Sequence, residues 1–280
     1  MKLVQKLTVI LMSVFLCGGC ARHIDEQASP LGDNNLNSTL WMQSSAEFMA
    51  ISLQTYDAAE RNLEEAVKAV TVSAVVEQPA PHTSLPPAVI MDIDETVLDN
   101  SGYDAKLILE NSSYSSATWD QWVAVGQARA IPGAVKFINH AKNEGVAVIF
   151  ITNRMCKERE GIADRCPQKS ETIDNLKKAG ISDIQPSLVL LRKEQDDWTA
   201  EKAGRRELMA EKYRIVMLFG DDLGDFLPNV KKDITPEQRA RLVADHEEKW
   251  GRVWYMLPNP KYGSWLQILK KPKAQYLQGY

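Results

Sequence analysis

Five short apolar runs alternate with amphipathic segments between residues 88 and 257, and this alternation restricts the fold more than any other feature. The runs lack the polar alternation of a half-exposed strand, which is typical of strands buried on both faces of a parallel sheet. Pro132 suits a helix start, and Gly145 and Gly180 suit helix ends. The expected strands are 88–91, 146–151, 188–191, 215–219 and 253–257, and the expected helices are 132–143, 170–178, 200–213 and 236–250. The sequence therefore predicts an α/β fold with a Rossmann-like parallel sheet flanked by helices.

Two further regions accompany this core, which we place at 85–268. Apolar residues recur every three or four positions before the proline-rich connector that precedes the core, and predict a small N-terminal helical region at 40–76. The segment 101–130 is too long for a simple crossover and contains several aromatic residues, so we expect an insertion near the functional site. Residues 269–280 form the expected C-terminal tail.

The first residues are typical of an export signal. Lys2 and Lys6 precede an apolar stretch at 7–17 that is too short to span a bilayer, and Gly18, Gly19 and Cys20 follow. This arrangement resembles the bacterial lipoprotein signal, in which residues 1–19 are removed and Cys20 is lipidated. Residues 20–39 would then be a flexible tether.

A lipidated Cys20 would anchor a soluble domain to a bacterial membrane after export. By family analogy, Ala21 directly after Cys20 favours the outer membrane, with the domain on its periplasmic or surface face. A soluble secreted protein cut nearby and an uncleaved anchor remain alternatives.

Charge and cysteine content limit the possible partners and the redox setting. Removal of Lys2 and Lys6 with the signal would take the formal charge from −4 to −6, which gives no support for binding a nucleic-acid polymer. Only Cys156 and Cys166 would then remain as unmodified cysteines. An exported pair is compatible with a disulfide, but two free thiols in a loop are equally compatible.

Polar side chains follow three of the expected strands at the point where each strand ends. Asp92 and Asp94 follow the first, Thr152, Asn153 and Arg154 follow the second, and Gly220-Asp221-Asp222-Leu223-Gly224-Asp225 follows the fourth. Burying a carboxylate costs several kcal/mol unless it is paired or bound to a metal. Because parallel strands end at one edge of a sheet, these side chains are expected to converge in one pocket with Lys202 from a later helix.

In this order and spacing, the polar groups resemble the four motifs of the haloacid dehalogenase (HAD) superfamily. Three further features narrow the resemblance to one family within this superfamily. They are Leu98, Asp99 and Asn100 after the first motif, the run Leu257-Pro258-Asn259-Pro260 before Tyr262, Gly263 and Trp265, and the 41–56 segment. Together with the lipoprotein signal, they resemble the class C acid phosphatases. These are bacterial lipoproteins that dephosphorylate nucleoside monophosphates and other monoesters. The resemblance covers residues 41–265 and implies a HAD-like core.

The resemblance implies specific roles for the acidic residues. Asp92 would attack phosphorus and form an aspartyl-phosphate, and Asp94 would protonate the leaving oxygen and then activate water. Asp94 must begin this cycle protonated, which predicts an acidic pH optimum. Asp92, Asp221 and Asp225 would bind Mg²⁺, to which Asp94 would contribute its backbone carbonyl. The alternatives are a structural helix or loop cap for Asp92 and a solvated acidic turn for Asp221 and Asp225.

Other residues are candidates for substrate binding. Thr152 and the amide of Asn153 would bind phosphate oxygens, and Lys202 would neutralise their charge, with Lys193 as its rival. By resemblance, Tyr262 would stack on a nucleobase. The aromatic residues of the insertion could form a second wall of the pocket or belong to the core: Tyr103, Trp119 and Trp122.

The sequence thus predicts a membrane-tethered acid phosphatase for small phosphomonoesters, with nucleoside monophosphates as the expected substrates. A phosphomonoesterase of broad specificity and a non-catalytic surface lipoprotein that binds a ligand are the alternatives. The oligomeric state is left open, with a homodimer as one option.

Overall fold

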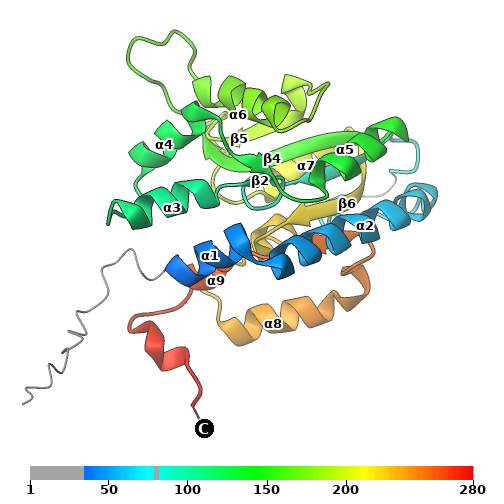
Figure 1. Ribbon diagram of the computed structural model, residues 1–280. Helices are drawn as coiled ribbons and strands as arrows, with labels where there is room; N and C mark the ends of the chain where they lie inside the picture. Colours follow the sequence, from blue (N-terminus) through cyan, green and yellow to red (C-terminus); the bar gives the residue numbers. More distant parts are fainter. Residues whose placement is uncertain (1–34, 79–81, 280) are drawn as a thin grey trace, which may run out of the picture.

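The computed structural model describes residues 35–78 and 82–279. Its centre is a parallel sheet in the order β5-β4-β1-β6-β7 (Figure 1). The strands are β1 (Pro87–Met91), β4 (Ala147–Met155), β5 (Val189–Arg192), β6 (Arg214–Gly220) and β7 (Trp254–Met256). All five coincide with the expected apolar runs, so the predicted α/β fold is confirmed.

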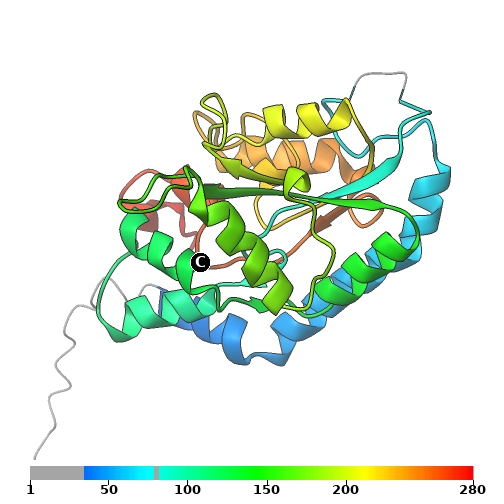
Figure 2. The same cartoon turned by 90° about the horizontal axis from the view of Figure 1, so that it is seen from above.

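The strands are buried on both faces because helices cover the sheet on each side. On one face lie α5 (Ala134–Asn143) and α6 (Pro167–Lys178), and on the other lie α7 (Ala203–Ala210) and α8 (Pro236–Asp245) (Figure 2). Alternate residues of β1 join different apolar clusters. Val89 and Met91 pack with Phe137 of α5, whereas Ala88 and Ile90 belong to the cluster that contains Met209 of α7. This two-sided burial explains why the strands contain so few polar residues.

The N-terminal helical region consists of α1 (Leu36–Ser44) and α2 (Ala46–Lys68). Helix α1 begins at Leu36 rather than at residue 40, so the last residues of the expected 20–39 tether are helical. Ser45 caps α2 by accepting a hydrogen bond from the Phe48 amide. Helix α2 packs on α5 and contacts β6 and β7. The expected signal peptide and Cys20 lie outside the described residues.

The insertion begins and ends at a two-stranded antiparallel sheet formed by β2 (Leu98–Asp99) and β3 (Arg129–Ala130). Between these strands lie α3 (Ser101–Leu109) and α4 (Ser116–Val125), which pack against α1 and α6 respectively. The sequence predicted the insertion but not this strand pair, because two residues are too few to show a period. The insertion therefore sits on the sheet face covered by α2, α5 and α6.

Smaller features complete the described part of the chain. Two short helices near the C-terminus are α9 (Ser264–Gln267) and η5 (Lys273–Tyr276). A disulfide joins Cys156 and Cys166 and closes the loop between β4 and α6. No helix within 35–78 or 82–279 is both long and apolar enough to cross a membrane.

Candidate active site

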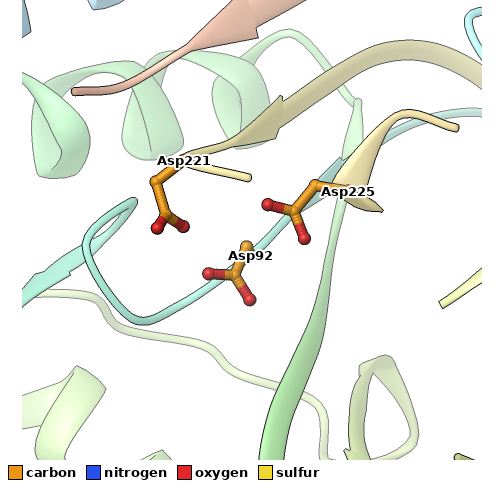
Figure 3. A group of neighbouring side chains, drawn as sticks. All are labelled: Asp92, Asp221 and Asp225. Atoms are coloured by element: carbon orange, nitrogen blue, oxygen red, sulfur yellow. The ribbon is translucent and has the colours of Figure 1, made fainter. Parts of the chain in front are cut away.

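Three carboxylates meet at the carboxyl edge of the sheet. Asp92 follows β1, Asp221 follows β6, and Asp225 ends the short helix η3 (Leu223–Asp225). One oxygen of each lies within 4.8 Å of the other two, and the three side chains face a common space (Figure 3). Gly220 permits this arrangement because a Cβ at that position would overlap the Asp225 side chain.

Lys202 is the cation that this cluster contains. Its Nζ donates to the Asp92 carboxylate and lies 2.6 Å from Asp225 Oδ1, and the lysine is buried. The rival Lys193 is exposed, and its Nζ donates to the carbonyl of Asp196. The structure thus places Lys202, and not Lys193, at the candidate centre.

The electrostatics of the cluster favour a bound cation. Burial raises the pKa of Asp92 to about 7, against the opposing charge of Lys202. Burial and the charge of Asp92 raise the pKa of Asp221 well above its usual value. Burial opposes the charge of Lys202, but Asp225 and Asp92 more than offset this and raise its pKa. Three carboxylates and one lysine leave a formal charge of −2, so the residues present fit a divalent metal ion held by oxygen ligands.

Asp94 is held in a separate set of contacts. Arg154 donates to Asp94 Oδ1 from Nε at 3.0 Å and from Nη2 at 2.8 Å. Asn100 donates to the same oxygen at 2.9 Å, and the Thr152 hydroxyl donates to Oδ2 at 3.3 Å. The Asp94 side chain is therefore not part of the three-carboxylate cluster. Its expected metal contact, through the backbone carbonyl, stays a prediction. Sequence reasoning gave Arg154 no role.

Thr152 and Asn153 belong to the last part of β4, which extends past its expected end at residue 151. Arg205 fixes this strand end by donating to the Thr152 carbonyl at 2.6 Å and to Asn153 Oδ1 at 2.8 Å. Thr152 therefore has a fixed position beside Asp94, and Asn153 follows it at the same strand end. The pairing also gives the Lys202-x-x-Arg205 spacing a structural reason.

A second buried charged cluster, the Lys261 cluster, joins the turn after β1 to the insertion and to the C-terminal loop. Lys261 Nζ lies 2.9 Å from Glu95 and 2.5 Å from Asp104, and the Tyr262 hydroxyl donates to Glu95. Glu95 has a φ of 60° and accepts from the Asn100 amide at 2.8 Å, so these contacts hold a strained backbone. Sequence reasoning identified only Tyr262 in this cluster.

A cavity of about 530 Å³ opens beside these groups. Asp92, Asp94, Asn153, Lys202, Asp221 and Asp225 line it, and so does Tyr262, which is 37% exposed. Tyr103, Tyr114 and Trp119 contribute an aromatic wall from the insertion. Trp122 does not line the cavity and instead donates from its ring nitrogen to Asn100 Oδ1. Two of the three candidate wall residues thus reach the cavity.

Comparisons with known proteins agree with this geometry. The class C acid phosphatase from Bacillus anthracis superposes with a TM-score of 0.74 at 29% identity, over 90% of this chain and 100% of that one, both in one structure and in another with tungstate bound. The stem 28 kDa glycoprotein of Glycine max is 30% identical over 143 residues, 49% of this chain and 52% of that one. Acid phosphatase 1 of Solanum lycopersicum is 30% identical over 142 residues, 49% of this chain and 51% of that one.

This chain spans about half the length of the curated relatives that it matches. The family model covers far more, because it matches residues 22–265 and therefore includes every side chain of the site. The chain belongs to HAD superfamily subfamily IIIB, the acid phosphatases.

Proposed function

We propose that this chain is an acid phosphatase that hydrolyses small phosphomonoesters with Mg²⁺ as its cofactor. The observation that carries the proposal is the convergence of Asp92, Asp221 and Asp225 with Lys202 at the mouth of a cavity. A phosphomonoester is doubly charged, so a nucleophile can approach its phosphorus only where cations offset that charge. Lys202 supplies one cation, and the −2 formal charge of the cluster suits a divalent ion.

In the proposed reaction, a carboxylate oxygen of Asp92 attacks phosphorus while the bond to the leaving oxygen breaks. Asp94 donates its proton to that oxygen, which leaves an aspartyl-phosphate on Asp92. Water then attacks the same phosphorus while the bond between phosphorus and the Asp92 oxygen breaks. Asp94 takes up a proton from the water, inorganic phosphate leaves, and the Asp92 carboxylate is regenerated. Lys202, the Thr152 hydroxyl and the Asn153 amide hold the phosphate oxygens. Mg²⁺ bound by Asp92, Asp221 and Asp225 would neutralise charge on the phosphoryl group.

We further propose that nucleoside monophosphates are favoured substrates. Tyr103, Tyr114 and Trp119 face the same cavity as Tyr262, so a planar base has aromatic surfaces to stack on. The related class C enzyme was solved with tungstate, a tetrahedral oxyanion like phosphate, which supports an oxyanion site in the shared fold. Export and lipidation at Cys20, which would tether the enzyme to a bacterial membrane, complete the proposal.

The test is turnover of 4-nitrophenyl phosphate by the purified protein with and without Mg²⁺. We expect turnover that a chelator abolishes and Mg²⁺ restores, and a loss of at least about 10³-fold in Asp92→Asn. The matched control is Asp233→Asn, which removes one negative charge at an exposed site where φ is 55° and Asn is tolerated. Turnover at the wild-type rate in Asp92→Asn would refute the mechanism. An absence of turnover by the wild-type protein itself would favour the non-catalytic alternative.

Specificity needs a separate comparison. The kcat/KM for a nucleoside 5′-monophosphate should exceed that for a sugar phosphate of equal charge, because only the nucleotide has a ring to stack. Equal values would instead indicate a phosphomonoesterase of broad specificity.

A further inference from the structure

Four cationic side chains line the active-site cavity, and two of them pair with acids of the site. Arg154 is paired with Asp94, and Lys202 is paired with Asp92 and Asp225. Arg192 and Lys231 also line the cavity, and both are partly buried. Within the described residues, neither forms an ion pair.

Lys231 lies beside Asn153, which is proposed to bind the phosphate. Its Nζ donates to the carbonyl of Ala200 at 2.8 Å, and the Asn153 side chain donates to that same carbonyl at 3.1 Å. Burial lowers the pKa of Lys231, and the positive charge of Lys202 acts in the same direction, against the pull of Asp225. Asp222 and Glu201 also attract Lys231, but no acid in the described part of the chain forms an ion pair with it.

Arg192 reaches the same region from the end of β5. It pairs in register with Met155 of β4, two residues beyond Asn153. Burial and the positive charge of Arg192 lower the pKa of Arg205, which donates a hydrogen bond to Asn153. Its Nε is buried and has no hydrogen-bond partner in the described structure. A buried N–H of this kind is costly unless something accepts its proton.

Lys231 and the aromatic wall come from different sides of the sheet. Tyr103, Tyr114 and Trp119 belong to the insertion, which packs on α1 and α6. Lys231 precedes α8 and contacts Ala200, which precedes α7, and these two helices cover the other face (Figure 2). A ligand in the cavity would therefore meet aromatic rings on one side and the Lys231 ammonium group on the other.

We infer that Arg192 and Lys231 form a second anion subsite, which selects phosphomonoesters whose leaving group has another negatively charged group besides an aromatic base. This inference rests on the proposed function and narrows its substrate class. Nucleoside 3′,5′-bisphosphates are the simplest compounds with this chemistry. Hydrolysis at one phosphate would release inorganic phosphate and a nucleoside monophosphate, and the remaining phosphate would occupy the subsite.

The experiment compares kcat/KM for a nucleoside 3′,5′-bisphosphate, the matching 5′-monophosphate and 4-nitrophenyl phosphate. We expect the wild type to prefer the bisphosphate over the monophosphate by about tenfold at low salt, since a partly buried charge pair is strong enough for this. Added salt should reduce the preference. Wild type without this preference would overturn the subsite, and this measurement needs no variant.

Variants then locate the subsite. The double variant Arg192→Gln/Lys231→Gln should lose the preference, Arg192→Lys should retain part of it, and Lys193→Gln, which alters a neighbouring exposed lysine, should keep the wild-type ratio. An equal loss on all three substrates in the double variant would assign both cations to the transferred phosphoryl group and refute the second subsite. Failure of the proposed function is distinguishable, because the wild type would then not hydrolyse 4-nitrophenyl phosphate at all.

Discussion

The turn after β1 contributes to two groups of buried charges, and the chain neutralises them to different degrees. In the Lys261 cluster, one lysine contacts both acids, Glu95 and Asp104. In the cluster around Asp92, Lys202 contacts two of the three acids. Among the described residues, the third acid, Asp221, accepts hydrogen bonds from Asn259 at 2.8 Å and Thr96 at 3.2 Å but forms no ion pair. The first arrangement fixes three segments in place, whereas the second leaves charge that a cation can neutralise.

The largest expected effect is on stability, and it distinguishes Lys261 from Lys202 by whether Mg²⁺ can substitute for the lost ammonium group. Lys261→Met leaves Glu95 and Asp104 buried without a cation, which should cost about 3–5 kcal/mol of unfolding free energy. Lys202→Met should cost a similar amount in metal-free protein. Mg²⁺ should restore more of that loss in Lys202→Met than in Lys261→Met, because a bound ion can offset only the charge near Asp92.

Chemical denaturation with and without Mg²⁺ measures both variants. The triple variant Glu95→Gln/Asp104→Asn/Lys261→Met is the control, since removing all the partners of a buried charge cluster is often nearly neutral. If Mg²⁺ restored the free energy of unfolding equally in the two single variants, the cluster around Asp92 would not be the one whose charge a bound cation neutralises.

A pH titration of metal-free stability tests the cluster around Asp92 with a somewhat smaller effect, to which Glu95 and Asp104, whose pKa values burial also raises, add in the same direction. Burial raises the pKa of Asp92 to about 7 and that of Asp221 well above its usual value. A carboxyl with a raised pKa binds its proton more tightly in the folded state, so stability is greatest at low pH and is lost as pH rises from about 4 through about 7. The expected loss is on the order of a few kcal/mol.

Unfolding of chelator-treated protein between pH 5 and pH 8 measures this loss. Asp120 and Asp222 have lowered pKa values, from Arg159 and from Ser264 respectively, so their opposite contribution falls below this window. Asp221→Asn should flatten the profile, and Mg²⁺ should reduce the fall in the wild type. If the unfolding free energy of Asp221→Asn fell with pH as steeply as that of the wild type, the Asp221 carboxyl would not be the source of the pH dependence.

Sequence reasoning found the cluster around Asp92 but missed most of the Lys261 cluster, and the reason is physical. Asp92 and Asp221 each follow an apolar run directly, so their place at a strand end could be predicted from local pattern alone. Lys261 and Glu95 are 166 residues apart, and no local period relates them. The one signal in the sequence was the place of Glu95 in the acidic motif 91–96, directly after Asp94.

The same limit applies to element boundaries and to Arg154. Thr152 and Asn153 were expected after a strand and lie within it, because Arg205, more than 50 residues away, continues to satisfy the backbone there. The contact between Arg154 and Asp94 spans 60 residues, so the sequence showed the arginine beside Thr152 without showing its partner.

Arg154 gives the smallest expected effect and connects the two clusters, because the Asp94 that it holds acts electrostatically on both Asp92 and Glu95. Its guanidinium binds Asp94 through Nε and Nη2, a geometry that lysine cannot reproduce. Arg154→Lys should therefore misplace the proton donor, with a loss of about tenfold to 10²-fold for alkyl phosphates, whose leaving oxygen needs a proton. For 4-nitrophenyl phosphate, which leaves readily as an anion, the loss should be smaller. Thr172→Val removes a different hydrogen bond of the Arg154 guanidinium, from Nη1 at 3.3 Å, without touching Asp94, and serves as the control. A loss in Arg154→Lys that is equal for both leaving groups would show that Arg154 acts on the phosphoryl group rather than through Asp94.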